Sequence, residues 1–242
     1  MSQGISVWVL EAPHGFGDAA FHSHHAIQIT ASIVGDLMLS TGDLTLRAPY
    51  LAVAPDQRHR FEAHGLLVFI FVEPESHMGR ALTATLFKDR PLMRLEPSAI
   101  GHLLRPLATT FDEALYNEAL LRVGRAIVEQ LAPGTQAQLP DPRVQKIIDY
   151  AAAHLDKPLS LEAGSRGIYL SPSRLWHLFA EQPGLAFKTY VLWLRLVRAV
   201  QAYSEGSNLT EAAHAAGFAD SAHFSRTFRR TFGLPATTLT KV

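Results

Sequence analysis

The chain lacks cysteine, an excess of either charge and any long hydrophobic run, and each absence excludes a class of protein. With no cysteine among its 242 residues it forms neither disulfides nor thiolate metal sites, which fits a reducing compartment. The N-terminal stretch has no basic segment typical of a secretory signal, and the run from Leu66 to Val72 is far too short to span a bilayer. We therefore expect a cytoplasmic protein with no membrane partner.

The net charge of zero conceals two halves of opposite sign. Residues 1–140 contain 10 Lys and Arg against 14 Asp and Glu, whereas residues 141–242 contain 12 against 8. The second half is therefore the one expected to meet an anionic partner, although a solvated basic face would give the same counts. A chain of this length is long enough for two ordinary hydrophobic cores.

The first third of the chain is typical of short strands separated by turns. Pairs such as Gly35-Asp36 and Gly42-Asp43 tolerate the positive φ of tight hairpin turns. Strands this short and this closely spaced favour a sandwich or barrel. The predicted strands are residues 5–10, 26–33, 37–40, 44–46, 51–54 and 66–73.

A group of histidines lies within this strand-rich half. His22 and His24 share one face of an extended strand because side chains alternate, and a hairpin-rich barrel could bring His59 close to them. The spacing of His22, His24, Gln28 and Gly35 resembles the first cupin motif, with Gln28 where that family usually has Glu. The resemblance implies a cupin-like barrel, and in metal-binding cupins His22, His24, residue 28 and His59 would converge on one ion.

Three interpretations of this group remain open. The histidines and Gln28 could line a pocket for a small organic effector, could bind a metal, or could only pack and hydrogen-bond. Gln28 lacks the charge of a carboxylate, which weakens the case for a divalent cation. The candidate effector-pocket residues are His22, His24, Gln28 and His59, and the candidate ligands of a divalent metal are His22, His24 and His59. No cofactor is required.

Helical spacing begins after the strands. Residues 75–88 give no clear pattern, whereas residues 98–109 and a longer stretch from about Asp112 to Leu131 place apolar residues on one face. Such a stripe either packs in a core or joins two copies, so we consider a homodimer through these helices, about residues 98–131. Residues 132–140 are uncharged and contain Pro and Gly, which predicts a linker. Residues 1–131 are then the effector-binding and dimerisation domain.

The remainder of the chain contains one pattern twice. Phe179 and Gly184 recur 49 residues later as Phe228 and Gly233, which indicates two equivalent helical units. Ser171-Pro172 is a helix start, so the first helix-turn-helix spans about residues 161–181. An uninterrupted helix is expected from Pro183 to Tyr203. Its length of about 30 Å approaches the roughly 34 Å between successive major grooves.

The second copy of the helical pattern resembles the signature of the AraC/XylS family of transcription regulators. The residues that carry the resemblance are Ala212-Ala213, Gly217-Phe218, His223 to Arg226, Phe228 and Gly233, and the match covers about residues 143–240. The resemblance implies a DNA-binding domain over residues 141–242 and double-stranded DNA as the partner. The expected fold is α+β with two domains: a cupin-like β-barrel or jelly roll with flanking helices, then an all-α domain of two helix-turn-helix units joined by a long helix.

In that family both recognition helices enter adjacent major grooves. The groove-facing residues implied here are Ser173, Arg174, Trp176 and His177 in the first helix, and Ser221, Ala222, Ser225 and Arg226 in the second. Arg226 is the strongest candidate for a guanine edge, because a guanidinium can donate two hydrogen bonds to O6 and N7. Lys188, Arg229 and Arg230 fit phosphate contacts better. Solvated surface for the basic residues, and partial burial for Trp176, remain the alternatives.

The first copy of the helical pattern departs from the family pattern. Gly164-Ser165 replaces the usual Leu-Ala pair, and Tyr169 stands where the turn commonly has Gly. A positive φ would be costly for a bulky residue, so we expect a less regular first unit.

The function expected is that of a sequence-specific DNA-binding transcription regulator, not an enzyme, controlled by a small-molecule effector in the N-terminal barrel. No nucleophile, paired carboxylate or phosphate-binding glycine loop suggests catalysis. The alternative is a metal-dependent cupin enzyme with an appended helical domain, which rests on the histidines and Gln28.

Overall fold

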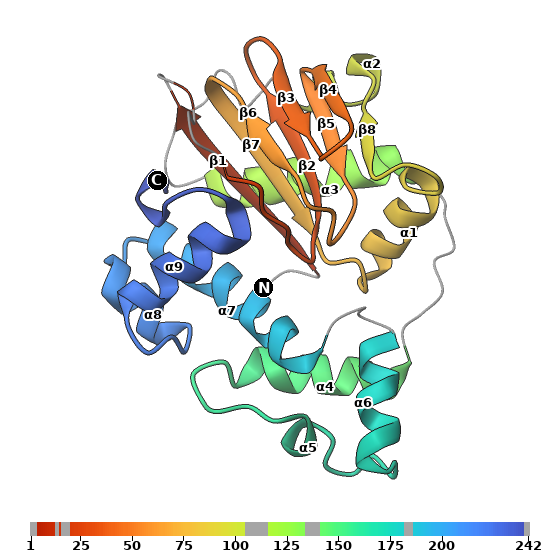
Figure 1. Cartoon of the computed structure of the whole chain (residues 1–242), viewed down its shortest axis with the longest axis vertical. Coiled ribbons are helices and arrows are strands. Elements are labelled where there is room, and N and C mark those ends of the chain that lie inside the picture. The colour runs from red at the N-terminus through yellow and green to blue at the C-terminus, as the bar shows by residue number, and fades with distance from the viewer. Residues whose placement is uncertain are drawn as a thin grey trace. The chain divides into compact units, whose positions relative to one another are not determined.

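The chain forms two compact units. The structure, a computed structural model, describes residues 4–12, 15, 20–104, 116–133, 141–181 and 186–239. The first unit consists of the residues up to Gln138 together with Arg230–Thr240, and the second consists mainly of Leu139–Arg229. The first unit is rich in strands and the second is helical (Figure 1).

The strands of the first unit form two antiparallel sheets. One has the strand order β1-β7-β2-β5-β8 and the other the order β4-β3-β6. The strands are β1 (Ile5–Ala12), β2 (Ile27–Ser32), β3 (Leu37–Ser40), β4 (Thr45–Ala48), β5 (Tyr50–Val53), β6 (Arg60–Glu62), β7 (Gly65–Val72) and β8 (Leu92–Arg94). Within the described residues they pair as two sheets and not as one closed barrel. The predicted sheet-rich architecture is confirmed, and a cupin-like barrel stays a prediction.

The central strands β2 and β7 are covered on both faces. On β2, Ile27 and Ile29 enter the hydrophobic core beside the helices, while Gln28 and Thr30 are buried on the opposite face. Successive residues of a strand alternate between faces, so burial of both faces explains why the run Leu66 to Val72 is apolar throughout. The alternation also turns Gln28 toward the inner face that holds the histidines.

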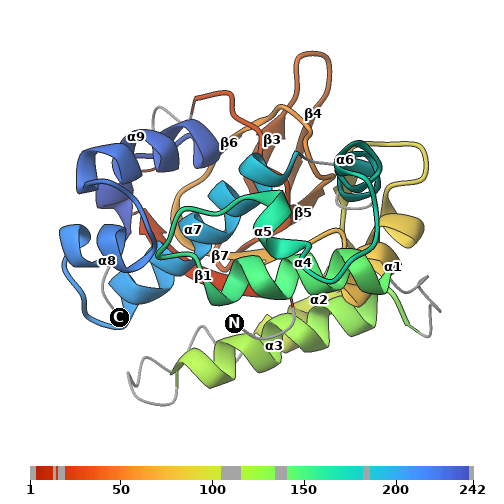
Figure 2. The ribbon, with the colours of Figure 1, turned by 90° about the horizontal axis from the view of Figure 1, so that it is seen from below.

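Three helices of the first unit supply the other half of its core. They are α1 (His77–Leu86), α2 (Pro97–Leu104) and α3 (Tyr116–Leu131), and α2 and α3 lie side by side (Figure 2). A 3-10 helix, η2 (Ala236–Thr238), also belongs to this unit. Leu120, Ile127 and Val128 of α3 are buried in the core that includes β1 and β7.

Close packing of α3 bears on the predicted dimer contact. A Cβ on Gly124 would lie 2.5 Å from Val7 Cγ2, so glycine lets the helix approach β1. The apolar stripe of α3 is thus used inside the unit. A homodimer through these helices stays a prediction, and residues 112–115 of the expected helical stretch lie outside the described residues.

Some elements were not predicted. Residues 75–88 contain α1, which begins where the Ser76 hydroxyl accepts a hydrogen bond from Gly79 N–H at 2.9 Å. The strands β6 and β8 have three residues each, too few for a pattern of alternation, and they form because they pair with β3 and β5.

The second unit is built from helices. They are α4 (Pro142–Ala153), α5 (Leu161–Gly164), α6 (Pro172–Glu181), α7 (Phe187–Ser204), α8 (Leu209–Ala215) and α9 (Ser221–Phe232). The last residues of α9, from Arg230 on, are assigned to the first unit. The expected helix start at Pro183 is wrong, because Ala186 has extended backbone and α7 begins at Phe187. Its 18 residues span about 27 Å. No helix in the described part of the chain is both long and apolar enough to cross a membrane.

Candidate effector site and candidate DNA-binding helices

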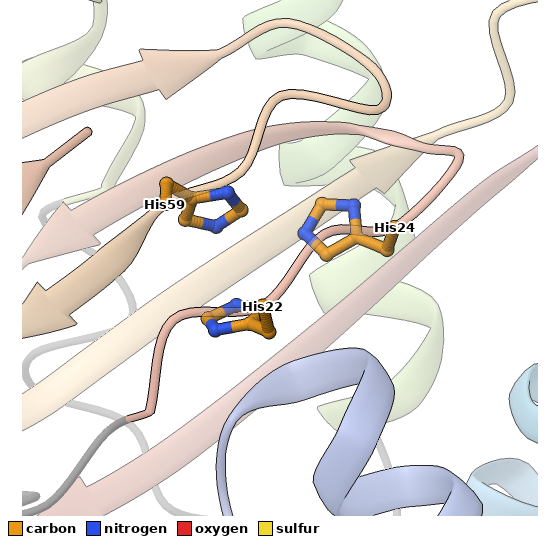
Figure 3. A group of neighbouring side chains, drawn as sticks. All are labelled: His22, His24 and His59. Carbon is orange, nitrogen blue, oxygen red and sulfur yellow. The ribbon is translucent and has the colours of Figure 1, made fainter. Parts of the chain in front are cut away.

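The three predicted histidines meet on the inner face of the first unit (Figure 3). His22 and His59 form an isolated antiparallel bridge in which each backbone N–H donates to the other residue's carbonyl at 2.8 Å. The candidate ligand nitrogens of His22, His24 and His59 all lie within 4.8 Å of one another, and all three residues are buried. Spacing in the sequence put His22 and His24 together, and the bridge brings His59 to them.

Hydrogen bonds indicate which ring nitrogen carries the proton. The Nδ1 atoms lie against backbone carbonyl oxygens: His22 against Ala20 at 2.8 Å, His24 against Ala26 at 2.9 Å, and His59 against Gln57 at 2.8 Å. A carbonyl only accepts, so Nδ1 of each neutral ring donates and Nε2 keeps its lone pair. Within the described residues, the buried Nε2 atom of His59 has no hydrogen-bond partner, so its lone pair is available to a ligand.

The side chain of Gln28 is hydrogen-bonded to Nε2 of His24. One end of its amide lies 2.8 Å from His24 Nε2 and the other end lies 2.8 Å from Thr30 Oγ1. In the structure Gln28 Oε1 faces His24 Nε2, and Gln28 Nε2 donates to Thr30 Oγ1. A neutral His24 that donates through Nδ1 requires the amide to be turned by 180°, so that its N–H faces Nε2 and its oxygen accepts from the Thr30 hydroxyl. A metal ion bound by all three histidines would have to displace this hydrogen bond.

Burial keeps the three rings neutral. Removal from water disfavours the imidazolium and, with repulsion between neighbouring histidines, lowers the pKa of His22 to about 4 and that of His59 to about 2. The same burial lowers the pKa of His24. Three neutral imidazoles form a donor set that suits zinc, nickel, cobalt or copper better than magnesium or calcium.

His25, next in sequence, belongs to a charged cluster instead. Its Nε2 lies 2.9 Å from Glu75 Oε2, and its Nδ1 lies 3.6 Å from Asp56 Oδ2. Burial opposes protonation, but the two carboxylates outweigh it and raise the pKa of His25 to about 9. An imidazolium cannot bind a metal, so His25 has a structural role. Sequence reasoning missed Glu75, because no pattern links residues 50 positions apart.

The helices α5 and α6 form the first predicted helix-turn-helix. The positive φ of its turn falls on Gly167, at 78°, and not on Tyr169, so the strain expected at Tyr169 is wrong. Gly164 is buried, and a Cβ there would lie 3.1 Å from the Tyr150 ring. Close approach of α4, rather than a lost core contact, explains this glycine.

The exposed face of α6 carries the residues that the resemblance assigned to DNA. Leu175 and Phe179 are buried, whereas Ser173, Arg174, Trp176 and His177 are exposed. Trp176 is 52% exposed, so it lies at the surface with part of its side chain covered. Lys188, at the start of α7, is also exposed.

Arg195 of α7 ties the end of α4 to the turn of the second helix-turn-helix. Its Nε donates to the carbonyl of Leu155 at 3.1 Å, and its Nη2 donates to that of Lys157 at 3.0 Å. A Cβ on Gly217, in the turn after α8, would lie 2.0 Å from the same Leu155 oxygen.

The helices α8 and α9 form the second predicted helix-turn-helix. Asn208 and Glu211 make a capping box at the start of α8, and Gly217 takes φ 82° in the turn. Phe224 and Phe228 bury one face of α9. Of the predicted contact residues, Ala222, Arg226, Arg229 and Arg230 are exposed, and Ser221 and Ser225 are half-buried.

The class of domain follows from comparison with known proteins. Residues 165–241 match the family model of the helix-turn-helix domain. The chain therefore contains a helix-turn-helix domain, and the curated proteins that it matches are HTH-type transcriptional regulators.

Individual relatives share part of their length with this chain. The HTH-type transcriptional regulator YpdC of Escherichia coli K12 is 32% identical over 141 residues, which is 57% of this chain and 48% of YpdC. The transcriptional activator RhaS of Escherichia fergusonii is 33% identical over 152 residues, 62% of this chain and 52% of RhaS. The chain thus spans about half the length of these curated relatives.

A solved structure resembles the chain over nearly its full length. Apo ToxT of Vibrio cholerae superposes with a TM-score of 0.60 at 14% identity, covering 98% of this chain and 97% of ToxT. A ToxT structure with a bound unsaturated fatty acid gives a TM-score of 0.57 at 15% identity, covering 97% and 95%. At such identity the likeness shows the fold: a sheet-rich part followed by a helical part.

Proposed function

We propose that the chain is a sequence-specific DNA-binding transcription regulator of the cytoplasm. The observation that carries this proposal is the helix-turn-helix match over residues 165–241, in a unit that has two such motifs, α5–α6 and α8–α9, on either side of α7. Residues 141–242 are the proposed DNA-binding domain, residues 132–140 the linker, and residues 1–131 the effector-binding domain, which also forms the homodimer.

The two proposed recognition helices present different chemistry to DNA. Arg226 of α9 is exposed and reads a guanine, while Arg229 and Arg230, with Lys188 of α7, neutralise phosphates. The face of α6 offers Ser173, Trp176 and His177, which can make hydrogen bonds and apolar contacts to base edges.

DNA binding is tested on duplexes that the full chain selects from a random-sequence pool. Because phosphate contacts release counterions, the affinity falls steeply as salt rises, and a flat response would refute the proposal. Arg226→Ala is expected to cost about 1–3 kcal/mol and to relax preference at one base pair. Arg229→Ala is the matched control on the same helix: it weakens all sequences alike and lowers the salt slope by about 0.9.

We infer that the effector binds at the histidine group of the first unit, His22, His24, Gln28 and His59. Two observations bear on its class. The neutral rings and the unused Nε2 of His59 suit a transition-metal ion. A small organic molecule has support from ToxT, whose fold is similar and which binds an unsaturated fatty acid.

Metal analysis of the purified chain separates these effectors. Stoichiometric zinc, nickel, cobalt or copper that is lost in His59→Ala and retained in His77→Ala identifies a metal; His77 is an exposed histidine of the same unit. A metal-free wild-type chain refutes the metal, and a thermal-shift screen of organic ligands then names the effector through a raised Tm.

The same histidines are the support for the second candidate, a metal-dependent cupin enzyme with an appended helical domain. The homologues favour regulation, because they are transcriptional regulators and not enzymes. Turnover of an organic substrate that requires the bound metal, without any effect of that metal on DNA affinity, would reverse this preference.

A further inference from the structure

The exposed surface of α6 divides into two flanks. Residues three, four and seven positions apart lie on the same side of a helix. Arg174, His177, Leu178 and Glu181 therefore share one flank, and Ser173, Trp176 and Ala180 share the other. His177 lies two positions from both Leu175 and Phe179, opposite the buried face, so it marks the centre of the exposed surface.

The flank that bears Arg174 is joined by an arginine from another helix. Arg143, in the first turn of α4, lines a cavity of about 400 Å³ together with Leu170, Arg174, His177, Leu178 and Glu181. The side chain of Arg143 is 48% exposed. Two arginines from different helices thus line one cavity beside the proposed recognition helix.

Asp141 holds Arg143 in a fixed orientation. Its Oδ1 accepts from Arg143 Nε at 2.9 Å, and its Oδ2 accepts from Nη2 at 2.5 Å. These bonds occupy one edge of the planar guanidinium, and the donors on Nη1 and the second hydrogen of Nη2 point away from Asp141. The carboxylate reduces the local positive charge, but it sets the fork in the geometry that a second oxyanion can use.

We propose that Arg143 and Arg174 clamp one DNA phosphate at the edge of the major groove that α6 enters. The inference rests on the proposed function, DNA binding, and adds a contact outside both recognition helices. It also changes the role of Arg174, which then positions the duplex and reads no base. His177 and Ser173, nearer the centre of the exposed face, remain to contact bases.

The chemistry around the cavity favours a phosphate over a base edge. A phosphodiester carries a full negative charge and accepts from two guanidinium forks at once, which a single base edge cannot do. Leu170 and Leu178 give the cavity apolar walls, so part of the water around the charges is excluded. Glu181 lies seven residues from Arg174, about 10 Å along the helix, and its charge directs the phosphate toward the arginines.

The test compares three variants of the full chain on two duplexes. One duplex is selected from a random-sequence pool by the wild-type chain, and the other has the same composition in scrambled order. Arg143→Ala and Arg174→Ala each remove one arginine of the clamp. Lys157→Ala is the control, because it removes one positive charge from an exposed residue beyond the other end of α4, and the helix rises about 15 Å between Arg143 and Ala153.

Arg143→Ala and Arg174→Ala are each expected to lower the affinity for both duplexes about 3- to 10-fold. Each should also lower the slope of log affinity against log salt by up to about 0.9, and leave the preference between the duplexes unchanged. Lys157→Ala is expected to leave both quantities near wild type. The clamp is overturned if Arg143→Ala behaves like the control, or if Arg174→Ala alters the base preference. Failure of the wild-type chain to bind either duplex would instead remove the proposed function itself. Matching thermal unfolding of all variants shows that they fold.

Discussion

Replacing Gly217 by alanine tests the contact between the segment after α4 and the turn of the second helix-turn-helix motif. At φ 82° a side chain costs about 1–2 kcal/mol of left-handed strain. The new Cβ would also lie 2.0 Å from the Leu155 carbonyl oxygen and 3.0 Å from Arg195 Nε. The backbone has to shift, and the hydrogen bond from Arg195 to Leu155 is lost at a cost of about 1.5–3 kcal/mol. We expect the free energy of unfolding of the second unit to fall by about 2.5–5 kcal/mol.

Gly167→Ala is the matched control for this prediction. Gly167 occupies the turn of the first motif at φ 78°, and the nearest atom to its Cβ is the flexible Lys146 Nζ at 3.4 Å. Gly167→Ala should lower the free energy of unfolding only by the left-handed strain, about 1–2 kcal/mol. Urea denaturation followed by far-UV circular dichroism measures both, with a midpoint shift of about 1–3 M expected for Gly217→Ala. Equal losses in the two variants would show that the Leu155 carbonyl does not constrain the turn.

Arg195→Met keeps the apolar stem but removes both hydrogen bonds to the end of α4, so we expect a loss of about 2–4 kcal/mol by the same denaturation, against a smaller loss for Arg198→Met. In metal-free protein, His22 and His59 have pKa values below those of the unfolded chain, so the unfolded state takes up protons first and stability should fall as the pH drops from about 6.5 toward 4. Each ring contributes up to about 1.4 kcal/mol per pH unit, and thermal unfolding that is flat over this range would contradict the assigned neutrality. The raised pKa of His25 has the opposite effect on stability. The stabilisation by charged His25 is present below about pH 6.5 and is lost as the pH rises through about 9. Glu75→Gln should make this fall in the free energy of unfolding smaller.

Local patterns in the sequence predicted the elements that depend on their own residues. Short apolar runs bounded by turn residues account for β2 and β7, and the Ser171-Pro172 start and the Asn208 to Glu211 cap account for the positions of α6 and α8. Prediction failed at α1, where the apolar pattern was unclear, and at β6 and β8, which depend on a neighbouring strand. The start of α7 was misplaced because the extended backbone of Ala186 leaves no signal in residue type.

The sequence by itself determined the repeated helical pattern, the strand-rich first half and the pairing of His22 with His24, because each depends on periodicity or spacing within a few residues. Only the tertiary structure decided that His59 reaches those rings, that His25 turns instead to Glu75, and that Arg143 joins the flank of α6. These contacts join residues about 30 to 50 positions apart, and their partners are selected by how strands pair and helices pack. Burial keeps His59 and its neighbouring rings neutral, whereas the carboxylates of Asp56 and Glu75 outweigh burial at His25 and keep it charged.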